Sequence, residues 1–178
     1  MKKILTLFAV IGLIAFSSCE GPEGPPGPPG RDGIGAEAFE IEASFSFNTT
    51  DGYIISDSFS KYLGGDLFQD ESVLVYRLEG TNNANSDVWQ LIPRDVYFEN
   101  GESITYDYNF SKQAFTIFVG GDNIANRPNF INNQVFRFVI IPADFGTGKS
   151  VNKVDFSDYN AVIKKYNIDD SNVKKFKI

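Results

Sequence analysis

Hydrophobic and polar residues alternate along much of the chain after residue 36, with the period of a β-strand that has one buried face. The alternation is clearest over residues 39–47 and 104–110. Turn residues stand beside these stretches: residues 48–52 follow the first, and Asn100-Gly101, the strongest hairpin signal in the chain, precedes the second. Further strands are expected over residues 53–60, 73–78, 88–92, 95–98, 114–119, 135–141 and 173–178.

Three of these segments carry more specific information. Residues 135–141 are apolar on both faces apart from Arg137, as expected of a strand in the middle of a sheet. Pro93 separates two strands, and proline belongs at a sheet edge or a bend. The lysines of residues 173–178 suit a final edge strand, because exposed charges discourage edge-to-edge pairing.

Helical spacing is rare in this sequence. It occurs near the C-terminal end, where Ser157 is the expected N-cap and Lys164 and Lys165 suit the last turn; the apolar positions are Phe156, Tyr159, Val162, Ile163 and Tyr166. A single helical turn is expected at residues 66–70, and the asparagine-rich residues 122–133 are expected to be the longest loop. We therefore expect residues 36–178 to form a mainly β head, an antiparallel β-sandwich or jelly roll with one short C-terminal helix.

The first 18 residues have the pattern of an export signal. A basic start, Met1-Lys2-Lys3, precedes an apolar run over residues 4–16, shorter than the ~20 residues that span a bilayer. Ser17-Ser18-Cys19 then resembles a bacterial lipobox, although Phe16 stands at the usual leucine position. We expect Cys19 to become the acylated first residue of a mature lipoprotein. An ordinary cleaved signal that leaves a free thiol is the alternative.

A glycine-proline segment follows the cysteine. Five of the eight prolines lie within residues 21–33, where glycine occupies every third position: Gly21, Gly24, Gly27, Gly30 and Gly33. This period is typical of collagen, and a homotrimer through a triple helix is one interpretation. A single-chain polyproline II spacer is the other, and we favour it because nothing else in the chain requires a trimer. Either form makes residues 19–35 a stiff stalk, about 40 Å long for residues 21–33 at ~3.1 Å per residue.

Composition excludes several classes of function. The net charge of −7 becomes −9 once residues 1–18, with Lys2 and Lys3, are removed, so nucleic acid is not an expected partner. The same charge is repelled by anionic lipid, so the membrane is expected to be reached through the N-terminal lipid. Histidine is absent, which removes the commonest general base and a common metal ligand. The single cysteine excludes an intrachain disulfide and a multi-thiolate metal site.

Residues 143–150 fit a relaxed phosphate-loop pattern, with Lys149 and Ser150 in the positions that would meet phosphate and magnesium. The residues after them alternate like a strand or loop, whereas such a loop must open a helix, so neither nucleotide nor any other cofactor is expected. Acidic pairs and triplets are interpreted as solvated turns, with calcium as the alternative: Asp66, Asp70 and Glu71; Asp155 and Asp158; Asp169 and Asp170. No metal site is expected.

The cysteine followed by the glycine-proline segment resembles the bacterial collagen-like lipoproteins. Residues 72–76, 88–93 and 136–142 are similar to stretches in the β heads of that family, so the resemblance covers most of the chain. It implies a protein attached to the cell envelope, at the outer membrane or cell surface. It implies no catalytic residue.

Three functions remain open for the head. A binding or structural module without enzymatic activity is preferred, a glycan-binding module is the first alternative, and a carboxylate-based hydrolase is the second. Among the strand aromatics Trp89, Tyr97, Tyr106 and Tyr108, most are expected in the core, and Trp89 is the best candidate for an exposed ligand contact. An exposed row of aromatics would favour glycan binding, and a cleft with two carboxylates would favour hydrolysis.

Overall fold

The computed structural model of the chain describes residues 35–142 and 154–178. The expected signal peptide, Cys19, the five stalk glycines and the glycine-rich segment with Lys149 and Ser150 lie outside the described residues.

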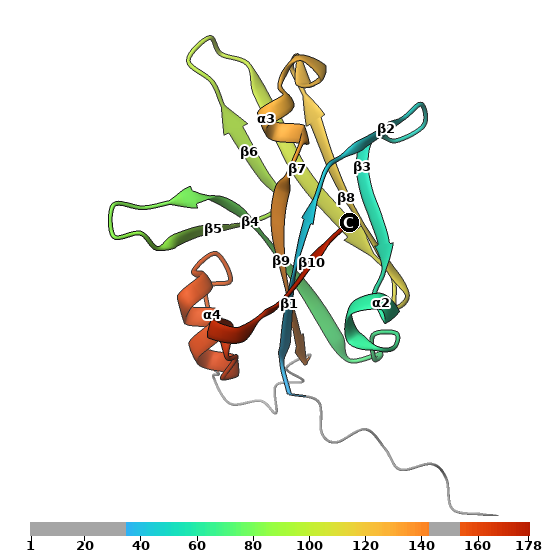
Figure 1. The fold of residues 1–178 in the computed structure, drawn as a ribbon, viewed down its shortest axis with the longest axis vertical. Coiled ribbons are helices and arrows are strands. Elements are labelled where there is room, and N and C mark those ends of the chain that lie inside the picture. Colours follow the sequence, from blue (N-terminus) through green and yellow to red (C-terminus); the bar gives the residue numbers. More distant parts are fainter. Residues whose placement is uncertain (1–34, 143–153) are drawn as a thin grey trace, which may run out of the picture. The chain divides into compact units, whose positions relative to one another are not determined.

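Ten strands make up most of the described head, and they form two five-stranded sheets (Figure 1). The strands are β1 (Glu37–Ala43), β2 (Ser46–Asn48), β3 (Gly52–Ser58), β4 (Glu71–Thr81), β5 (Asp87–Leu91), β6 (Arg94–Tyr97), β7 (Ser103–Phe110), β8 (Ala114–Gly121), β9 (Gln134–Pro142) and β10 (Lys174–Lys177). The first sheet has the order β10-β1-β9-β4-β5 and the second β2-β3-β8-β7-β6. The prediction of a mainly β, sandwich-like head is confirmed. The expectation of antiparallel pairing holds except at β10, which pairs parallel to β1.

The main core lies between the two sheets and is rich in aromatic rings. Phe138 of β9 is at its centre, stacked on Phe39 at 4.7 Å between ring centroids and in contact with Phe115 of the opposite sheet at 4.4 Å. Other fully buried side chains come from both sheets: Ile41, Val75, Ile104, Tyr106, Ile117 and Phe136. Burial of this apolar area is the main force that holds the sheets together, at roughly 25 cal/mol per Å².

β9 confirms the interpretation of residues 135–141 as a central strand. It pairs with β1 on one side and β4 on the other, so it has no free edge. Its inward residues enter the core between the sheets, and its outward residues Val139 and Ile141 pack beneath the C-terminal helix α4 (Tyr159–Tyr166). Figure 1 shows α4 on one side of β9 and the second sheet on the other. A strand covered on both faces needs apolar residues on both faces.

The C-terminal helix forms where its period predicted, but with a different first residue. Asp158, not Ser157, is the N-cap, because the Asp158 carboxylate accepts a hydrogen bond from the N–H of Ala161 at 3.0 Å. Ser157 instead donates to Asp155 in the turn before the helix. The helix buries Tyr159 and Val162 against the first sheet.

Three further expectations differ from the structure. The strand expected over residues 39–47 is divided: β1 ends at Ala43 and the chain crosses to the second sheet, which leaves Phe47 62% exposed. The helical turn lies at α2 (Ser60–Leu63) and not at residues 66–70. Residues 122–133 are not one loop, because they hold two short helical segments, η1 (Ile124–Asn126) and α3 (Pro128–Ile131).

Turn chemistry was predicted more accurately. Asn100-Gly101 joins β6 to β7, and Gly101 has a positive φ of 84°, a conformation that glycine adopts without strain. Pro93 lies at the bend between β5 and β6, where the chain passes from the first sheet to the second. The lysine-rich end of the chain is β10, an edge strand as expected.

Candidate functional site

One row of side chains crosses the outer face of the first sheet. The strand register places Arg137 of β9 opposite Tyr76 of β4 and Glu40 of β1, and extends the row to Leu91 of β5 and Lys175 of β10. Helix α4 covers the sheet on one side of this row, through contacts to Leu74, Val139 and Ile141. The row therefore marks the place where the covered part of the sheet face meets an open part.

Arg137 is the centre of this row and is buried. Its guanidinium donates hydrogen bonds to the Glu40 carboxylate and to the Tyr159 hydroxyl. It also lies over two aromatic rings, 4.2 Å from the ring centroid of Trp89 and 5.3 Å from that of Tyr159. Flat guanidinium groups pack well on such rings, and Trp89 is the stronger cation–π partner of the two.

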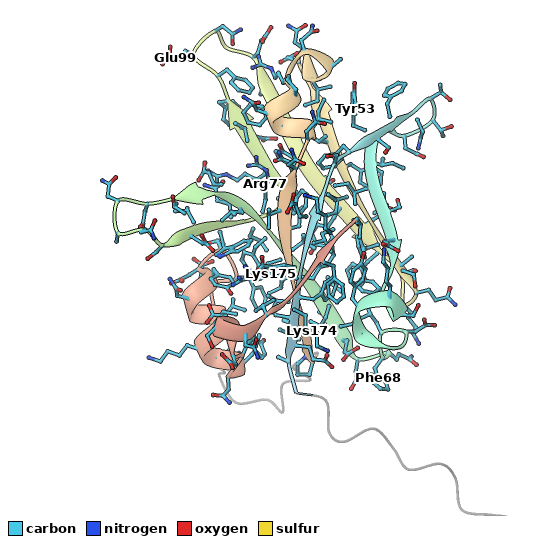
Figure 2. The ribbon with its side chains drawn as sticks, viewed as in Figure 1. Tyr53, Phe68, Arg77, Glu99, Lys174 and Lys175 are labelled. Atoms are coloured by element: carbon cyan, nitrogen blue, oxygen red, sulfur yellow. The ribbon has the colours of Figure 1, made fainter. Side chains whose placement is uncertain are left out.

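The charges around Arg137 form a connected network that extends to the surface. The Lys175 Nζ is 3.5 Å from a Glu40 carboxylate oxygen, on the side of β10 that faces the β4–β5 hairpin (Figure 2). At the other end, the Tyr159 hydroxyl donates to Asp170 at 3.2 Å, and that carboxylate is 3.8 Å from the Arg137 guanidinium. Asp170 lies in the 3₁₀ segment η2 (Asp170–Asn172) that follows α4.

The network shifts two pKa values. Burial disfavours the charged form of Arg137, but its hydrogen bonds to Glu40 and Tyr159 outweigh burial and raise its pKa. Burial raises the pKa of Tyr159 to about 12, although the hydrogen bond from Arg137 acts in the opposite direction. Arg137 is therefore a fixed cation and Tyr159 a fixed neutral hydroxyl throughout the physiological pH range.

One donor of this network is left without a partner. Among the buried side-chain nitrogen and oxygen atoms of residues 35–142 and 154–178, the Arg137 Nε is the one that has no hydrogen bond. Arg77, which also lies over an aromatic ring, differs in this respect: its Nε and Nη2 donate to Gln134 at 2.9 and 2.7 Å (Figure 2). A buried donor without an acceptor costs about 1–3 kcal/mol, so an oxygen of a ligand or of water beside the Arg137 Nε would be stabilising.

A cavity of about 520 Å³ opens at this position, and we name it the Arg137 cleft. Its walls are the β4–β5 hairpin and the start of α4, and its main lining residues are Asp87, Trp89, Arg137, Asp158, Tyr159 and Asp170. Asn82, Ser86, Ser157 and Asn160 add amide and hydroxyl groups. The cleft thus combines one half-buried indole with many hydrogen-bonding groups, and cavities of this size hold small ligands.

A second cavity of about 370 Å³ lies over the open part of the same sheet face, and we name it the β10 hollow. It is lined by Glu42, Leu78, Asp87, Val135, Lys175 and Lys177, together with Glu40. Asp87 lines both cavities, and Glu40 of the hollow is hydrogen-bonded to Arg137 of the cleft. The two cavities are therefore neighbours on one face.

Three carboxylates line the Arg137 cleft, and two of them have structural partners. Asp158 caps α4, and Asp170 accepts from Tyr159. Asp87 begins β5, where its backbone pairs with Thr81 of β4, and its carboxylate has no hydrogen bond or ion pair with another described side chain, so it is free to accept one from a ligand.

The aromatic residues considered as ligand contacts differ in how deeply they are buried. Trp89 lies on edge strand β5 as expected, but it is half-buried in the Arg137 cleft and not fully exposed. Tyr106 is in the core, with 1% exposure, and Tyr108 is partly buried against the core, whereas Tyr97 is 76% exposed and is the ring that faces solvent. Tyr97 lies near the end of β6 at the edge of the second sheet, where no described element covers it.

Three of the acidic residues considered for calcium accept hydrogen bonds within turns of the described structure. Glu71 accepts from the N–H of Phe68, and Asp155 and Asp169 each accept from a serine two residues later. Within the described ranges, no three Asp, Glu, His or Cys side chains lie close enough together to hold a metal ion.

Residues 35–142 and 154–178 contain no helix that is long and apolar enough to cross a bilayer.

Sequence reasoning missed the pairing of Arg137 with Glu40, which are 97 residues apart. One signal was present, because Arg137 is the single charged residue in the apolar run 135–141.

Comparisons of this chain with protein-family models, with curated proteins and with solved structures found no match.

Proposed function

We propose that this chain is a lipid-anchored protein of the bacterial cell envelope, and that its β head is a binding module whose ligand site is the Arg137 cleft. The pattern of residues 1–35 supports the anchor and the stalk. The observation that carries the binding site is the unpartnered Nε of a buried arginine, 5% exposed, at a cavity beside Trp89.

A binding role fits the chemistry of the cleft. Arg137 is neutralised by Glu40, so its guanidinium offers a directed hydrogen bond more than a net positive charge. The indole of Trp89 is held in place by Arg137 and by Tyr159, whose ring centroid is 5.9 Å away. Preorganised groups of this kind bind a ligand with little loss of side-chain entropy.

The anchor is tested by Cys19→Ala. We expect this variant to leave the membrane fraction, because acyl chains supply about 0.8 kcal/mol per buried CH₂ and the acidic head offers no electrostatic substitute. Fractionation of cells that express the chain, with mass spectrometry of the mature N-terminus, gives the result. Ser17→Ala keeps a small residue before Cys19 and is the control. Persistence of Cys19→Ala in the membrane fraction would contradict the anchor.

The ligand site is tested through Trp89, which is the single tryptophan of the chain. Its fluorescence reports directly on the Arg137 cleft, and panels of oligosaccharides and short peptides serve as probes. The protein is the chain from residue 19 onward with Cys19→Ala. We expect a saturable fluorescence change with one class of probe, and Trp89→Ala to weaken calorimetric binding of that probe about tenfold or more.

The matched control for Trp89→Ala is Tyr97→Ala, at an exposed aromatic ring of the other sheet. Its affinity should equal that of the unchanged protein. A binding module with its site elsewhere would keep its affinity in Trp89→Ala. That result would contradict the Arg137 cleft as the ligand site.

A carboxylate-based hydrolase is the second candidate, and the three carboxylates of the cleft are the observation that favours it. Hydrogen bonds already occupy Asp158 and Asp170, which leaves Asp87 as the free member. Incubation of the bound oligosaccharide with the protein distinguishes the two functions. A binding module returns the oligosaccharide intact, whereas a hydrolase releases new reducing ends and loses this activity in Asp87→Asn.

A further inference from the structure

Resting on the proposed function, we infer that the ligand is an extended, uncharged polyhydroxylated chain, an oligosaccharide, which runs from the Arg137 cleft past Asp87 into the β10 hollow. Three features of the outer sheet face point to this class of ligand: its charge, its hydrogen-bonding groups and the continuity of the two cavities.

Charge argues against a polyanion. The two cavities together are lined by five carboxylates and three basic groups: Glu40, Glu42, Asp87, Asp158 and Asp170 against Arg137, Lys175 and Lys177. Each basic group already faces a carboxylate, since Arg137 and Lys175 contact Glu40, and Lys177 contacts Glu42 at 2.6 Å. An anionic ligand would meet an excess of negative charge, on a chain whose net charge is −7.

The free hydrogen-bonding groups call for a ligand that both donates and accepts. The Arg137 Nε is a buried donor without an acceptor among the described residues, and the Asp87 carboxylate is an exposed acceptor that a ligand can reach. A hydroxyl group supplies both functions, and a sugar ring also has an apolar face that can pack on the indole of Trp89. A simple amine offers no acceptor for Arg137, and a simple carboxylate offers no donor for Asp87.

The position of the cavities favours a sugar chain over a peptide. One common way in which extended peptides bind is the addition of a strand to an open sheet edge. The Arg137 cleft and the β10 hollow instead lie over the face of the first sheet, and their lining side chains come from the strands of that sheet, the β4–β5 turn, the start of α4 and the segment η2. Because Asp87 belongs to both cavities, a chain that occupies one is directed into the other.

The experiment is a length series of neutral oligosaccharides, from the monosaccharide to the hexasaccharide. Oligomers of glucose, of mannose and of N-acetylglucosamine are titrated into the chain from residue 19 onward with Cys19→Ala. Trp89 fluorescence reports the cleft, and calorimetry reports affinity. We expect affinity to rise by about tenfold between the shortest and the longest bound member of one series, since the hollow adds contacts worth one or more hydrogen bonds.

Two variants separate the cavities. Val135→Arg places a long charged side chain on the floor of the β10 hollow, and it should abolish the gain with length while short oligomers bind as before. Asp87→Ala should weaken oligomers of every length, because Asp87 lines both cavities. Far-ultraviolet circular dichroism confirms that each variant is folded, and Val135→Ala is a second, smaller change that should reduce the gain with length.

Each other outcome overturns this inference in a recognisable way. Affinity that does not depend on length, or a gain that survives Val135→Arg, would contradict the extended path while the Arg137 cleft stands as a binding site. Preference for sulfated or uronic-acid oligosaccharides would contradict an uncharged ligand. A Trp89 response to peptides alone would replace the sugar with a peptide, and the proposed binding module would survive.

Discussion

Replacement of Arg137 by methionine is expected to lower the free energy of unfolding by about 3–5 kcal/mol, because it leaves the buried carboxylate of Glu40 without its main partner. The Glu40 side chain is 6% exposed, and its remaining ion-pair partner is Lys175 at 3.5 Å. Urea denaturation followed by circular dichroism measures the loss. The double replacement Arg137→Met with Glu40→Leu should recover much of it, since apolar side chains substitute well for a buried ion pair.

The control for Arg137→Met is a second ion pair of the same sheet, whose carboxylate, Glu42, lies two residues after Glu40 on β1. Lys177 and Glu42 form an ion pair in the same strand register, but the lysine side chain is 75% exposed. Lys177→Met should therefore change the free energy of unfolding by less than about 1 kcal/mol. Equal losses for Arg137→Met and Lys177→Met would show that the Arg137 network does not hold the outer face of the first sheet.

Phe138→Ala is expected to destabilise the head by about 3–5 kcal/mol, because it opens a cavity at the centre of the core. Phe138 is 0% exposed and packs against three other rings: Phe39 of β1, Phe115 of β8 and Phe59, which precedes α2. Phe138→Leu should cost less, since leucine fills part of the space. The same urea titration measures both variants.

Phe47→Ala provides the comparison for the core replacement. Phe47 is 62% exposed and touches mainly the ring of Tyr53, at 5.2 Å between centroids. Its loss is expected to cost less than about 1 kcal/mol, because little apolar area leaves water at this position. A larger loss for Phe47→Ala than for Phe138→Ala would contradict the placement of the core between the two sheets.

The sequence predicted this fold best where neighbouring residues alone show whether a segment is buried or forms a turn. Residues 135–141 are apolar on both sides, and β9 is buried by the second sheet on one side and by α4 on the other. Asn100-Gly101 predicted its hairpin because few residues other than glycine adopt the positive φ that the turn requires. Such features depend on neighbouring residues and need no knowledge of the rest of the fold.

The sequence failed where distant segments decide the environment. Glu40 alternates with apolar residues and looks like part of a solvent-exposed face, yet it is 4% exposed because Arg137 and the C-terminal segment cover it. Phe47 continues the same alternation, but the chain has by then crossed to the edge of the second sheet. The period of a strand shows which residues share a face, and only the packed structure shows what covers that face.

The candidate site also contains one residue that local sequence pattern predicted and others that depend on distant segments. Trp89 was selected from the sequence as a ligand contact, and it lines the Arg137 cleft. Its exposure was overestimated, because nothing near it in sequence shows that Arg137 and Tyr159 pack against its ring. Asp87, two residues before Trp89, was not selected, since a single carboxylate in a polar turn carries no signal of its own.

The most direct test of the binding site is the proton–nitrogen resonance of the Arg137 Nε, recorded on isotope-labelled protein during titration with the oligosaccharide that binds most tightly. Assignment follows from loss of the signal in Arg137→Lys. We predict that this resonance shifts progressively to saturation, with the dissociation constant that calorimetry reports, because a ligand oxygen becomes the acceptor of an Nε that has no partner among the described residues. A resonance that stays in place while the oligosaccharide binds would contradict the Arg137 cleft as its site.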